Sequence, residues 1–129
     1  MSDITVKEMI NEAKKNLKEL STDDVKNKLK SKDTLIVDLR DTSECIENGV
    51  IPGSYHVSRG HLEFSADPKC EHYKDFFNKE KNIILYCHTG ARSALASSTL
   101  KHMGYKKIAH MKGGFKLWMK KIGIIDDYK

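Results

Sequence analysis

Three short apolar runs constrain the fold of this chain more than any other feature of its sequence. They cover residues 35–39, 83–86 and 107–111, and each lies between polar residues or glycines. Runs this short and this apolar are typical of strands that are buried on both faces. Segments with helical periodicity separate them, so strands and helices alternate along the chain. This alternation predicts an α/β fold in which helices cover both faces of a parallel sheet.

Weaker patterns predict further elements around these strands. Residues 5–20 carry apolar side chains at helical spacing, which predicts an amphipathic helix that packs on the core. Ser21 and the polar residues after it suit the N-cap of a second, short helix. The remaining predicted elements are turns at 48–53, a short strand at 54–57, and helices at 71–79, 93–103 and 115–122.

The length and the cysteine content bound the class of protein. A chain of 129 residues suits one domain, and no repeat, low-complexity tract or linker divides it. It holds no run of 18 apolar residues, which excludes a membrane-spanning helix, and its first residues form no apolar targeting segment. Cys45, Cys70 and Cys87 lack the spacing of a disulfide framework. We therefore expect a cytoplasmic protein with free thiols.

The basic residues are of two kinds. The net charge is +5, with 23 basic and 18 acidic residues, and 20 of the basic residues are lysines. The lysines are scattered and not interleaved with aromatic residues, which indicates a solvated surface and not a nucleic-acid groove. Only Arg40, Arg59 and Arg92 are arginines. Each is therefore expected where a planar guanidinium is needed.

The segment 86–93, Tyr-Cys-His-Thr-Gly-Ala-Arg-Ser, carries the most chemical information. A predicted strand ends there and a predicted helix begins, so the loop lies at the carboxyl edge of the sheet, where ligands bind. Free N–H groups of the loop and of the helix start form an anion nest, which stabilises a thiolate. We therefore predict that Cys87 is a nucleophile. The predicted binding loop comprises His88, Thr89, Gly90, Ala91, Arg92 and Ser93.

Other interpretations of the cysteines are weaker. A cysteine at a strand end is often a small buried hydrophobe, but the glycine and arginine that follow Cys87 favour catalysis. Cys45 and Cys70 have no such neighbours and are expected to be inert. Cys70 and His72 have no second Cys/His pair at metal-ligand spacing. No metal site and no cofactor are therefore expected.

The length of the loop separates two chemistries. Cysteine-dependent phosphatases place five residues between their cysteine and arginine, whereas four residues separate Cys87 from Arg92. A shorter loop encloses a smaller centre. One sulfur atom bound to the cysteine fits such a centre, and a tetrahedral phosphoryl group is crowded there.

This loop and three further segments together resemble the rhodanese-like domain family. Residues 35–40 with Glu44 resemble the first strand of the family and its Asp-x-Arg segment. Residues 49–54 resemble its Gly-His-Ile-Pro-Gly-Ala segment, with Val50 in place of the histidine, so no role of that histidine carries over. Residues 112–118 resemble its Gly-Gly-aromatic helix start. The four segments occur in the expected order.

The resemblance implies a domain plan and a reaction. The plan is a single domain over residues 1–129, with an N-terminal helical extension (1–20) and a core (21–123). The core is a three-layer α/β/α fold with a mostly parallel sheet of about five strands. In the implied reaction, the Cys87 thiolate takes the outer sulfur of a donor such as thiosulfate. The amides of residues 88–92 would stabilise the resulting persulfide.

The same resemblance implies the partners. They are a small sulfur-donor anion and a thiophilic acceptor, either cyanide or a thiol, with a protein acceptor as a further candidate. Neither nucleic acid nor a membrane is expected. Two other functions stay open: a related cysteine-loop phosphatase or arsenate reductase, and a non-catalytic protein-binding module of the same fold.

The predicted second shell contains Asp38, Arg40 and Arg59. All three arginines of the chain are expected to lie around one mouth of the sheet. Arg40 is expected to pair with a nearby carboxylate, and Arg59 and Arg92 either contact the substrate anion or form such pairs. Asp38 is expected to accept hydrogen bonds that organise loops, not to act as a general base. His88 either tunes Cys87 or points to solvent.

Overall fold

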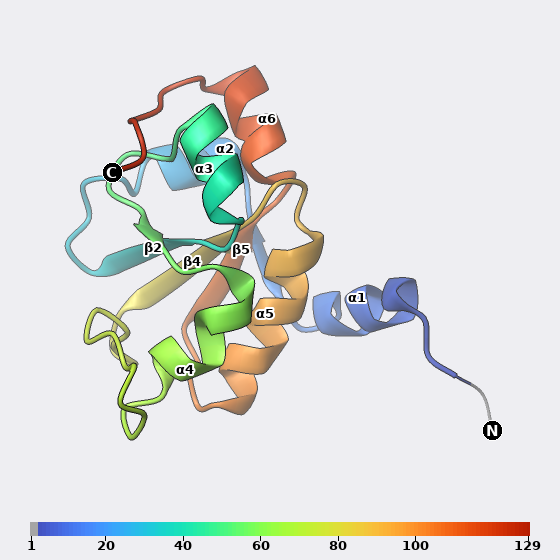
Figure 1. The fold of residues 1–129 in the computed structure, drawn as a ribbon. Helices are drawn as coiled ribbons and strands as arrows, with labels where there is room; N and C mark the ends of the chain where they lie inside the picture. Colours follow the sequence, from blue (N-terminus) through green and yellow to red (C-terminus); the bar gives the residue numbers. More distant parts are fainter. Residues whose placement is uncertain (1–2) are drawn as a thin grey trace.

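The computed structural model describes residues 3–129. Five parallel strands form a sheet in the order β1-β5-β4-β2-β3 (Figure 1), which confirms the predicted α/β fold. The strands are β1 (Lys18–Leu20), β2 (Thr34–Asp38), β3 (Tyr55–His56), β4 (Asn82–Tyr86) and β5 (Ile108–Met111). The helices are α1 (Val6–Lys14), α2 (Thr22–Lys26), α3 (Thr42–Asn48), α4 (Leu62–Ala66), α5 (Ala91–His102) and α6 (Gly114–Lys121), with a 3-10 turn at Arg59–His61.

Helices cover both faces of the sheet and divide the core in two. Figure 1 shows α2, α3 and α6 on one side of the strands and α4 and α5 on the other. Along β4, Ile83 and Leu85 pack toward α4 and α5, whereas Ile84 and Tyr86 pack toward α2 and α6. Burial of each such side chain contributes roughly 1.5–3 kcal/mol. The apolar runs are therefore strands that are buried on both faces, as predicted.

The parallel register brings the chemically interesting segments to one edge. Asp38 pairs with Tyr86 at the ends of β2 and β4, so the residues that follow both strands lie side by side. Helix α5 begins directly after the loop that follows β4, and α6 begins after β5. The carboxyl edge of the sheet therefore gathers two helix N-termini and the end of β2.

The predicted helix over residues 5–20 is wrong in its C-terminal part. Helix α1 ends at Lys14, and Lys18–Leu20 form the edge strand β1, which pairs with β5. Only Leu20 of this strand is buried, so its apolar pattern is too sparse to distinguish a strand from a helix. Residues 18–20 therefore belong to the sheet and not to a helical extension.

One further prediction is wrong, and two short helices were not predicted. Residues 71–79 form turns and no helix, and hydrogen bonds from Tyr73 to Cys70 and from Phe77 to Lys74 close these turns. Residues 42–48, which precede the predicted turns, form α3, and the Asp41 N–H before this helix donates to the Glu44 carboxylate at 2.8 Å. Helix α4 was also not predicted, because five residues are too few to show a helical period.

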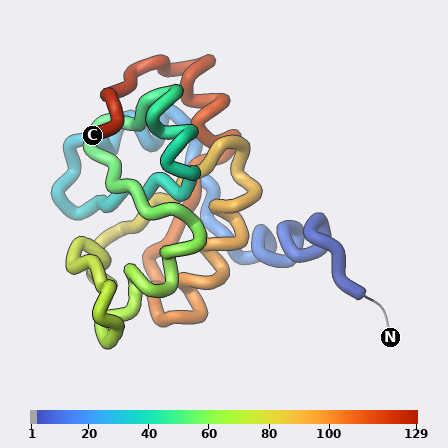
Figure 2. The backbone as a smooth tube through the Cα atoms, viewed as in Figure 1, coloured from blue at the N-terminus to red at the C-terminus, as the bar shows by residue number. Residues whose placement is uncertain are grey.

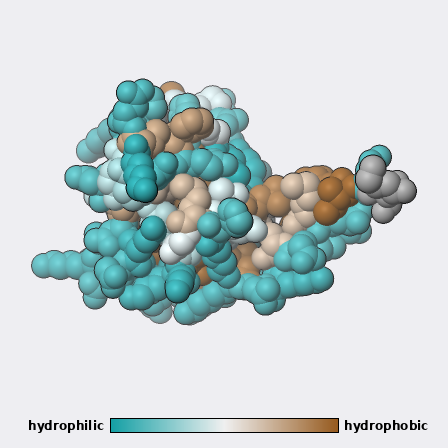
Figure 3. All heavy atoms as spheres, turned by 90° about the horizontal axis from the view of Figure 1, so that it is seen from below, coloured by the Kyte–Doolittle hydropathy of each residue, from teal (hydrophilic) through white to brown (hydrophobic). Residues whose placement is uncertain are grey.

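Helix α1 projects from the rest of the molecule, as the tube in Figure 2 shows. It contacts α5, but none of its residues is fully buried, and Val6 and Met9 are 63% and 45% exposed. Apolar side chains therefore gather along this segment in Figure 3. The expected packing of this helix on the core is only partial.

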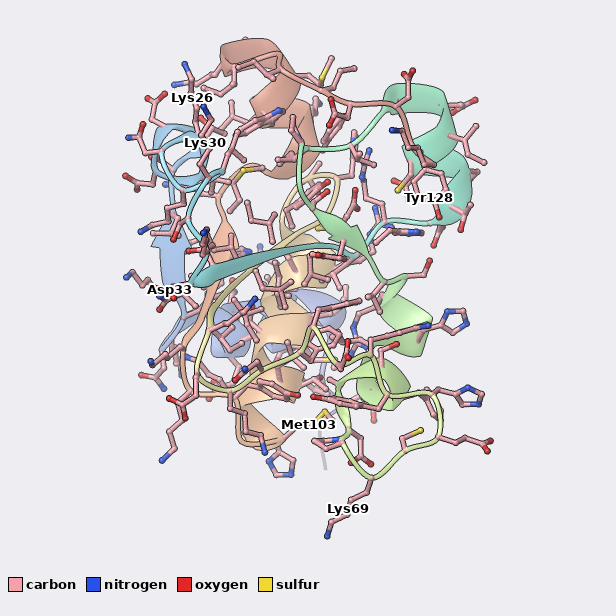
Figure 4. All side chains as sticks on the ribbon, turned by 90° about the vertical axis from the view of Figure 1, so that its left-hand side faces the viewer. Lys26, Lys30, Asp33, Lys69, Met103 and Tyr128 are labelled. Atoms are coloured by element: carbon pink, nitrogen blue, oxygen red, sulfur yellow. The ribbon has the colours of Figure 1, made fainter. Side chains whose placement is uncertain are left out.

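The C-terminal segment folds back beside β3 and the loop that precedes it. Val50 and Asp126 form an isolated antiparallel bridge. Tyr128, labelled in Figure 4, hydrogen-bonds His56 of β3 through its hydroxyl at 2.9 Å. This segment therefore lies against β3, the strand at one edge of the sheet.

Candidate active site

The loop after β4 turns back on Cys87. Gly90 has a φ of +111°, a left-handed conformation that a residue with a Cβ rarely adopts. Because of this turn, the backbone N–H groups of Gly90 and Ser93 both donate to the Cys87 Sγ, at 3.2 and 3.4 Å. The Ser93 hydroxyl lies 3.6 Å from the same sulfur. The sulfur therefore sits in a cradle of hydrogen-bond donors.

The start of α6 holds this loop from the other side. The N–H of Phe115 donates to the Cys87 carbonyl at 2.8 Å, and the N–H of Lys116 donates to the His88 carbonyl at 3.0 Å. Gly114 has a φ of +63°, and a Cβ at this position would lie 2.4 Å from the His88 carbonyl oxygen. The close approach explains in physical terms why a glycine stands at position 114, where the helix after β5 begins.

Cys87 is buried beneath the loop that surrounds it. Its exposed fraction is 1%, whereas His88 and Thr89 are exposed. Within residues 3–129, the amides of His88, Thr89, Ala91 and Arg92 donate to no protein acceptor. These amides belong to the loop and to the first turn of α5, where a helix leaves its N–H groups unpaired. The loop therefore has donors available for an anion beyond those that already contact the sulfur.

Arg92 pairs with a carboxylate of α3. Its two terminal nitrogens donate to Glu44 at 2.9 and 3.0 Å, a bidentate arrangement in which both side chains are about a third exposed. The Arg92 guanidinium lowers the pKa of the Glu44 carboxyl to about 2. Of the two roles expected for Arg92, the structure shows the carboxylate pair, which ties the start of α5 to α3.

Asp38 and Arg40 form a buried ion pair beside the loop. The Arg40 Nη2 donates to the Asp38 carboxylate at 2.7 Å and to the Gly49 carbonyl at 2.7 Å, and both side chains are almost fully buried. The Tyr86 hydroxyl donates to the same carboxylate at 2.6 Å. Asp38 thus accepts hydrogen bonds from several segments and organises them, which is the role expected from the sequence.

Arg40 also packs against the helix that supports the loop. Its guanidinium carbon lies 3.9 Å from the ring centroid of Phe115, which is a cation–π contact. Because the amide of Phe115 holds the Cys87 carbonyl, the buried ion pair and the loop share a support. Arg40 therefore acts on the loop through α6 and not through a contact with Cys87.

Arg59 lies apart from the loop. It donates to Glu63 at 2.9 Å and to Thr99 at 3.3 Å, and Thr99 is in the third turn of α5. At 1.5 Å per residue, this position is roughly 12 Å along the helix from its start. The structure therefore does not bring the three arginines together around one mouth.

The other two cysteines lie in different surroundings. Cys45 is fully buried next to Asp38, and burial together with that carboxylate raises the pKa of its thiol to about 12. Cys70 is partly exposed on the turns before residue 79. Among residues 3–129, no group of three His, Cys, Asp or Glu side chains is arranged to hold a metal ion.

The sequence analysis missed two residues that contact the site. His110 of β5 lies within 2.8 Å of the Ser93 hydroxyl through its Nδ1 and within 2.8 Å of the Glu19 carboxylate through its Nε2. Glu19 comes from β1, where the sequence predicted a helix. The one available signal was a histidine inside a predicted buried strand, which requires a polar partner.

Comparison with known proteins shows which family this chain resembles. The sequence matches the rhodanese-like domain family over residues 21–121. It is 29% identical over 101 residues to the mouse protein "Thiosulfate sulfurtransferase/rhodanese-like domain-containing protein 3", a match that covers 74% of this chain and 64% of that protein. It is 33% identical over 101 residues to "Putative sulfur carrier protein YrkF" of Bacillus subtilis (strain 168), which covers 78% and 50%. The match thus spans one half to about two thirds of these relatives.

A solved structure from Rhodopseudomonas palustris CGA009 is similar over nearly the whole chain. The two sequences are 40% identical. The structures superpose with a TM-score of 0.91, and the match covers 98% of this chain and 97% of that one. That protein is described as one of unknown function and "Possible Tyrosine Phosphatase". No helix within residues 3–129 is both long and apolar enough to cross a membrane. The family match includes β2, the Cys87 loop and α6, and the chain therefore belongs to the rhodanese-like domain family.

Proposed function

We propose that this protein is a sulfurtransferase that carries a sulfane sulfur as a persulfide on Cys87. The Cys87 thiolate attacks the outer sulfur of a donor anion such as thiosulfate, and a new S–S bond forms. The S–S bond of thiosulfate breaks, and its electron pair leaves with sulfite. A thiophilic acceptor, cyanide or a thiol, then attacks the outer persulfide sulfur and releases the Cys87 thiolate.

One observation carries this proposal: two backbone amides, of Gly90 and Ser93, converge on the Cys87 sulfur. Amides aimed at a sulfur stabilise it as an anion, without the reorganisation that water would need. The loop amides that have no protein acceptor would hold the terminal sulfur of the persulfide in the same way. His88 and Thr89 are exposed, so the outer part of the loop faces the side from which a donor would arrive.

The family and its relatives support a sulfur partner. Two curated relatives carry the words sulfurtransferase and sulfur carrier in their names. We infer from this that the acceptor of this protein is a small thiol or cyanide, or a thiol on another protein.

Mass spectrometry of the intact protein tests the proposal. A variant with Cys45→Ser and Cys70→Ser leaves Cys87 as its only thiol, and it is incubated with thiosulfate. We expect a mass increase of one sulfur atom, which a thiol reductant removes. The matched control adds Cys87→Ser and should show no increase. If the protein that retains Cys87 also gains no mass, the proposed function is wrong.

A second candidate function is a cysteine-dependent phosphatase, because the structure from Rhodopseudomonas palustris carries that description. Two observations weigh against it here. Four residues separate Cys87 from Arg92, and the terminal nitrogens of Arg92 are both engaged by Glu44. We expect no Cys87-dependent hydrolysis of an aryl phosphate. Turnover that is lost in Cys87→Ser would favour the phosphatase instead.

A further inference from the structure

Four side chains form a continuous chain of contacts from Cys87 to the protein surface. The Cys87 Sγ lies 3.6 Å from the Ser93 Oγ, and that hydroxyl lies 2.8 Å from the His110 Nδ1. The His110 Nε2 lies 2.8 Å from a carboxylate oxygen of Glu19. The residues come from the end of β4, from α5, from β5 and from β1, and neither His110 nor Glu19 belongs to the loop. Helix α5 and β5 are neighbours in Figure 1.

Burial makes this path the natural route for the thiol proton. Cys87, Ser93 and His110 are each at most 1% exposed, so water does not reach them directly. Glu19 is about one third exposed and stands at the outer end of the path. A proton that leaves a buried thiol needs a polar neighbour, and the Ser93 hydroxyl is the side chain that touches the sulfur.

Hydrogen-bonding rules give the chain one direction. A carboxylate accepts only, so the His110 Nε2 carries the hydrogen that faces Glu19. In a neutral imidazole the Nδ1 is then an acceptor, and the Ser93 hydroxyl donates to it. The hydroxyl has another acceptor, the Gly90 carbonyl, but this contact is longer, at 3.2 Å. With its hydrogen on His110, the Ser93 oxygen is free to accept the hydrogen of the Cys87 thiol.

Opposing influences act on the pKa of His110, and their net effect lowers it. Burial lowers the pKa of His110, so the imidazole is neutral at neutral pH, and the nearby Lys14 of α1 lowers it further. The Glu19 carboxylate acts in the opposite sense, because its hydrogen bond and charge raise the pKa of His110. The hydrogen bond from His110 lowers the pKa of Glu19, and Lys14 and Lys112 lower it further, which keeps it ionised.

We propose that Ser93 and His110 relay the proton of the Cys87 thiol and that Glu19 positions and charges His110 for this task. The Cys87 S–H bond breaks as its proton passes to the Ser93 oxygen, and the Ser93 proton passes to the His110 Nδ1. The products are a thiolate, held by the amides of Gly90 and Ser93, and an imidazolium paired with Glu19. No proton is gained or lost overall. This inference rests on the proposed sulfur transfer, in which the thiolate is the nucleophile.

The Glu19→Gln substitution tests the relay with little change in shape. Glutamine keeps the length of the side chain but removes the charge that stabilises the imidazolium, so the thiolate–imidazolium pair should be less populated. The ultraviolet absorbance of the Cys87 thiolate is measured at pH 7, with the matching Cys87→Ser protein subtracted in each case. We expect about tenfold less thiolate than in the unmodified protein.

Two further variants separate the relay from its alternatives. Glu12→Gln removes the same charge from α1 at a side chain that is 71% exposed, and its thiolate absorbance should match that of the unmodified protein. Ser93→Ala keeps the amide that contacts the sulfur but removes the hydroxyl, and its thiolate absorbance should fall as in Glu19→Gln. Circular dichroism checks that each variant is folded. If Glu19→Gln or Ser93→Ala holds as much thiolate as the unmodified protein does, the relay is wrong.

The test is independent of turnover. Absence of a sulfur adduct after thiosulfate treatment, together with less thiolate in both variants, would overturn the proposed sulfurtransferase and leave the relay in place. An adduct in the unmodified protein with unchanged thiolate absorbance in both variants would overturn the relay and leave the sulfurtransferase in place.

Discussion

Replacement of Gly114 by alanine should destabilise the protein, because the added Cβ would clash with the Cys87 loop at its contact with α6. The new Cβ would lie 2.4 Å from the His88 carbonyl oxygen and 2.6 Å from that of Cys87. Both neighbours are backbone atoms, so neither can rotate away as a side chain would. The loop or the start of α6 must therefore move by roughly half an ångström, which is an overpacking strain.

The size of the loss follows from three contributions. A left-handed conformation costs a residue with a Cβ about 1–2 kcal/mol, and the φ of Gly114 is +63°. Overpacking of a tight site costs about 1–3 kcal/mol. Movement of α6 also weakens the hydrogen bonds from Phe115 and Lys116 to the loop, each of which contributes about 1 kcal/mol. We expect the free energy of unfolding to fall by about 3 kcal/mol.

Urea unfolding measures this loss, and Gly60→Ala is the matched control. A Cβ at Gly60 meets no atom within 4 Å, and its φ is not in the left-handed region. That substitution should be neutral or stabilise the protein by up to about 1 kcal/mol, because alanine lowers the conformational entropy of the unfolded chain. The midpoint of Gly114→Ala should fall at an unchanged slope. If the two variants differ by less than about 0.5 kcal/mol, the close approach of α6 to the loop is not a constraint.

Two further predictions concern ionisable groups near the loop. Because the pKa of Glu44 is lowered to about 2, its pair with Arg92 stabilises the fold above the ordinary glutamate range and loses this contribution as pH falls toward 2. Glu44→Gln should therefore cost about 1–2 kcal/mol at pH 7 and almost nothing near pH 2, as measured by urea unfolding at both values. In alkylation followed by peptide mass mapping at neutral pH, Cys87 should react faster than Cys70 and much faster than Cys45, whose pKa is about 12. Equal rates would contradict the anion nest.

The fold was predictable where short segments carry their own signal. The apolar runs at β2, β4 and β5 are buried on both faces, so their composition identifies them without knowledge of the neighbours. The edge strand β1 is different, because Lys18 and Glu19 are exposed and only pairing with β5 makes the segment a strand. The turns at residues 71–79 are likewise set by contacts with other segments, such as the hydrogen bond from Lys74 to Ser65.

Some residues of the candidate site could likewise be predicted from a local segment, and others could not. The position of Cys87 and the turn at Gly90 follow from a local pattern of strand, loop and helix, and the sequence showed them. The amides of residues 88–92 were expected to hold the terminal sulfur of a persulfide, and that expectation stays a prediction. The Cys87 sulfur itself is contacted by the amides of Gly90 and Ser93. His110 and Glu19 reach the site only because β1 and β5 are neighbours in the sheet. A property of strand order is not visible in any single segment.

The three arginines bear on which groups would hold an anion at the loop. We expected all three around one mouth of the sheet, with Arg40 paired to a carboxylate and Arg59 and Arg92 either on the substrate anion or in such pairs. Each is paired with a carboxylate. The pairs are Arg40 with Asp38, Arg59 with Glu63 and Arg92 with Glu44. Their charges are thus largely balanced, so in the proposed reaction the groups that would hold the anion are backbone N–H groups. Such groups act over short distances and suit a small centre such as one sulfur atom, whereas a doubly charged phosphoryl group needs a free guanidinium fork.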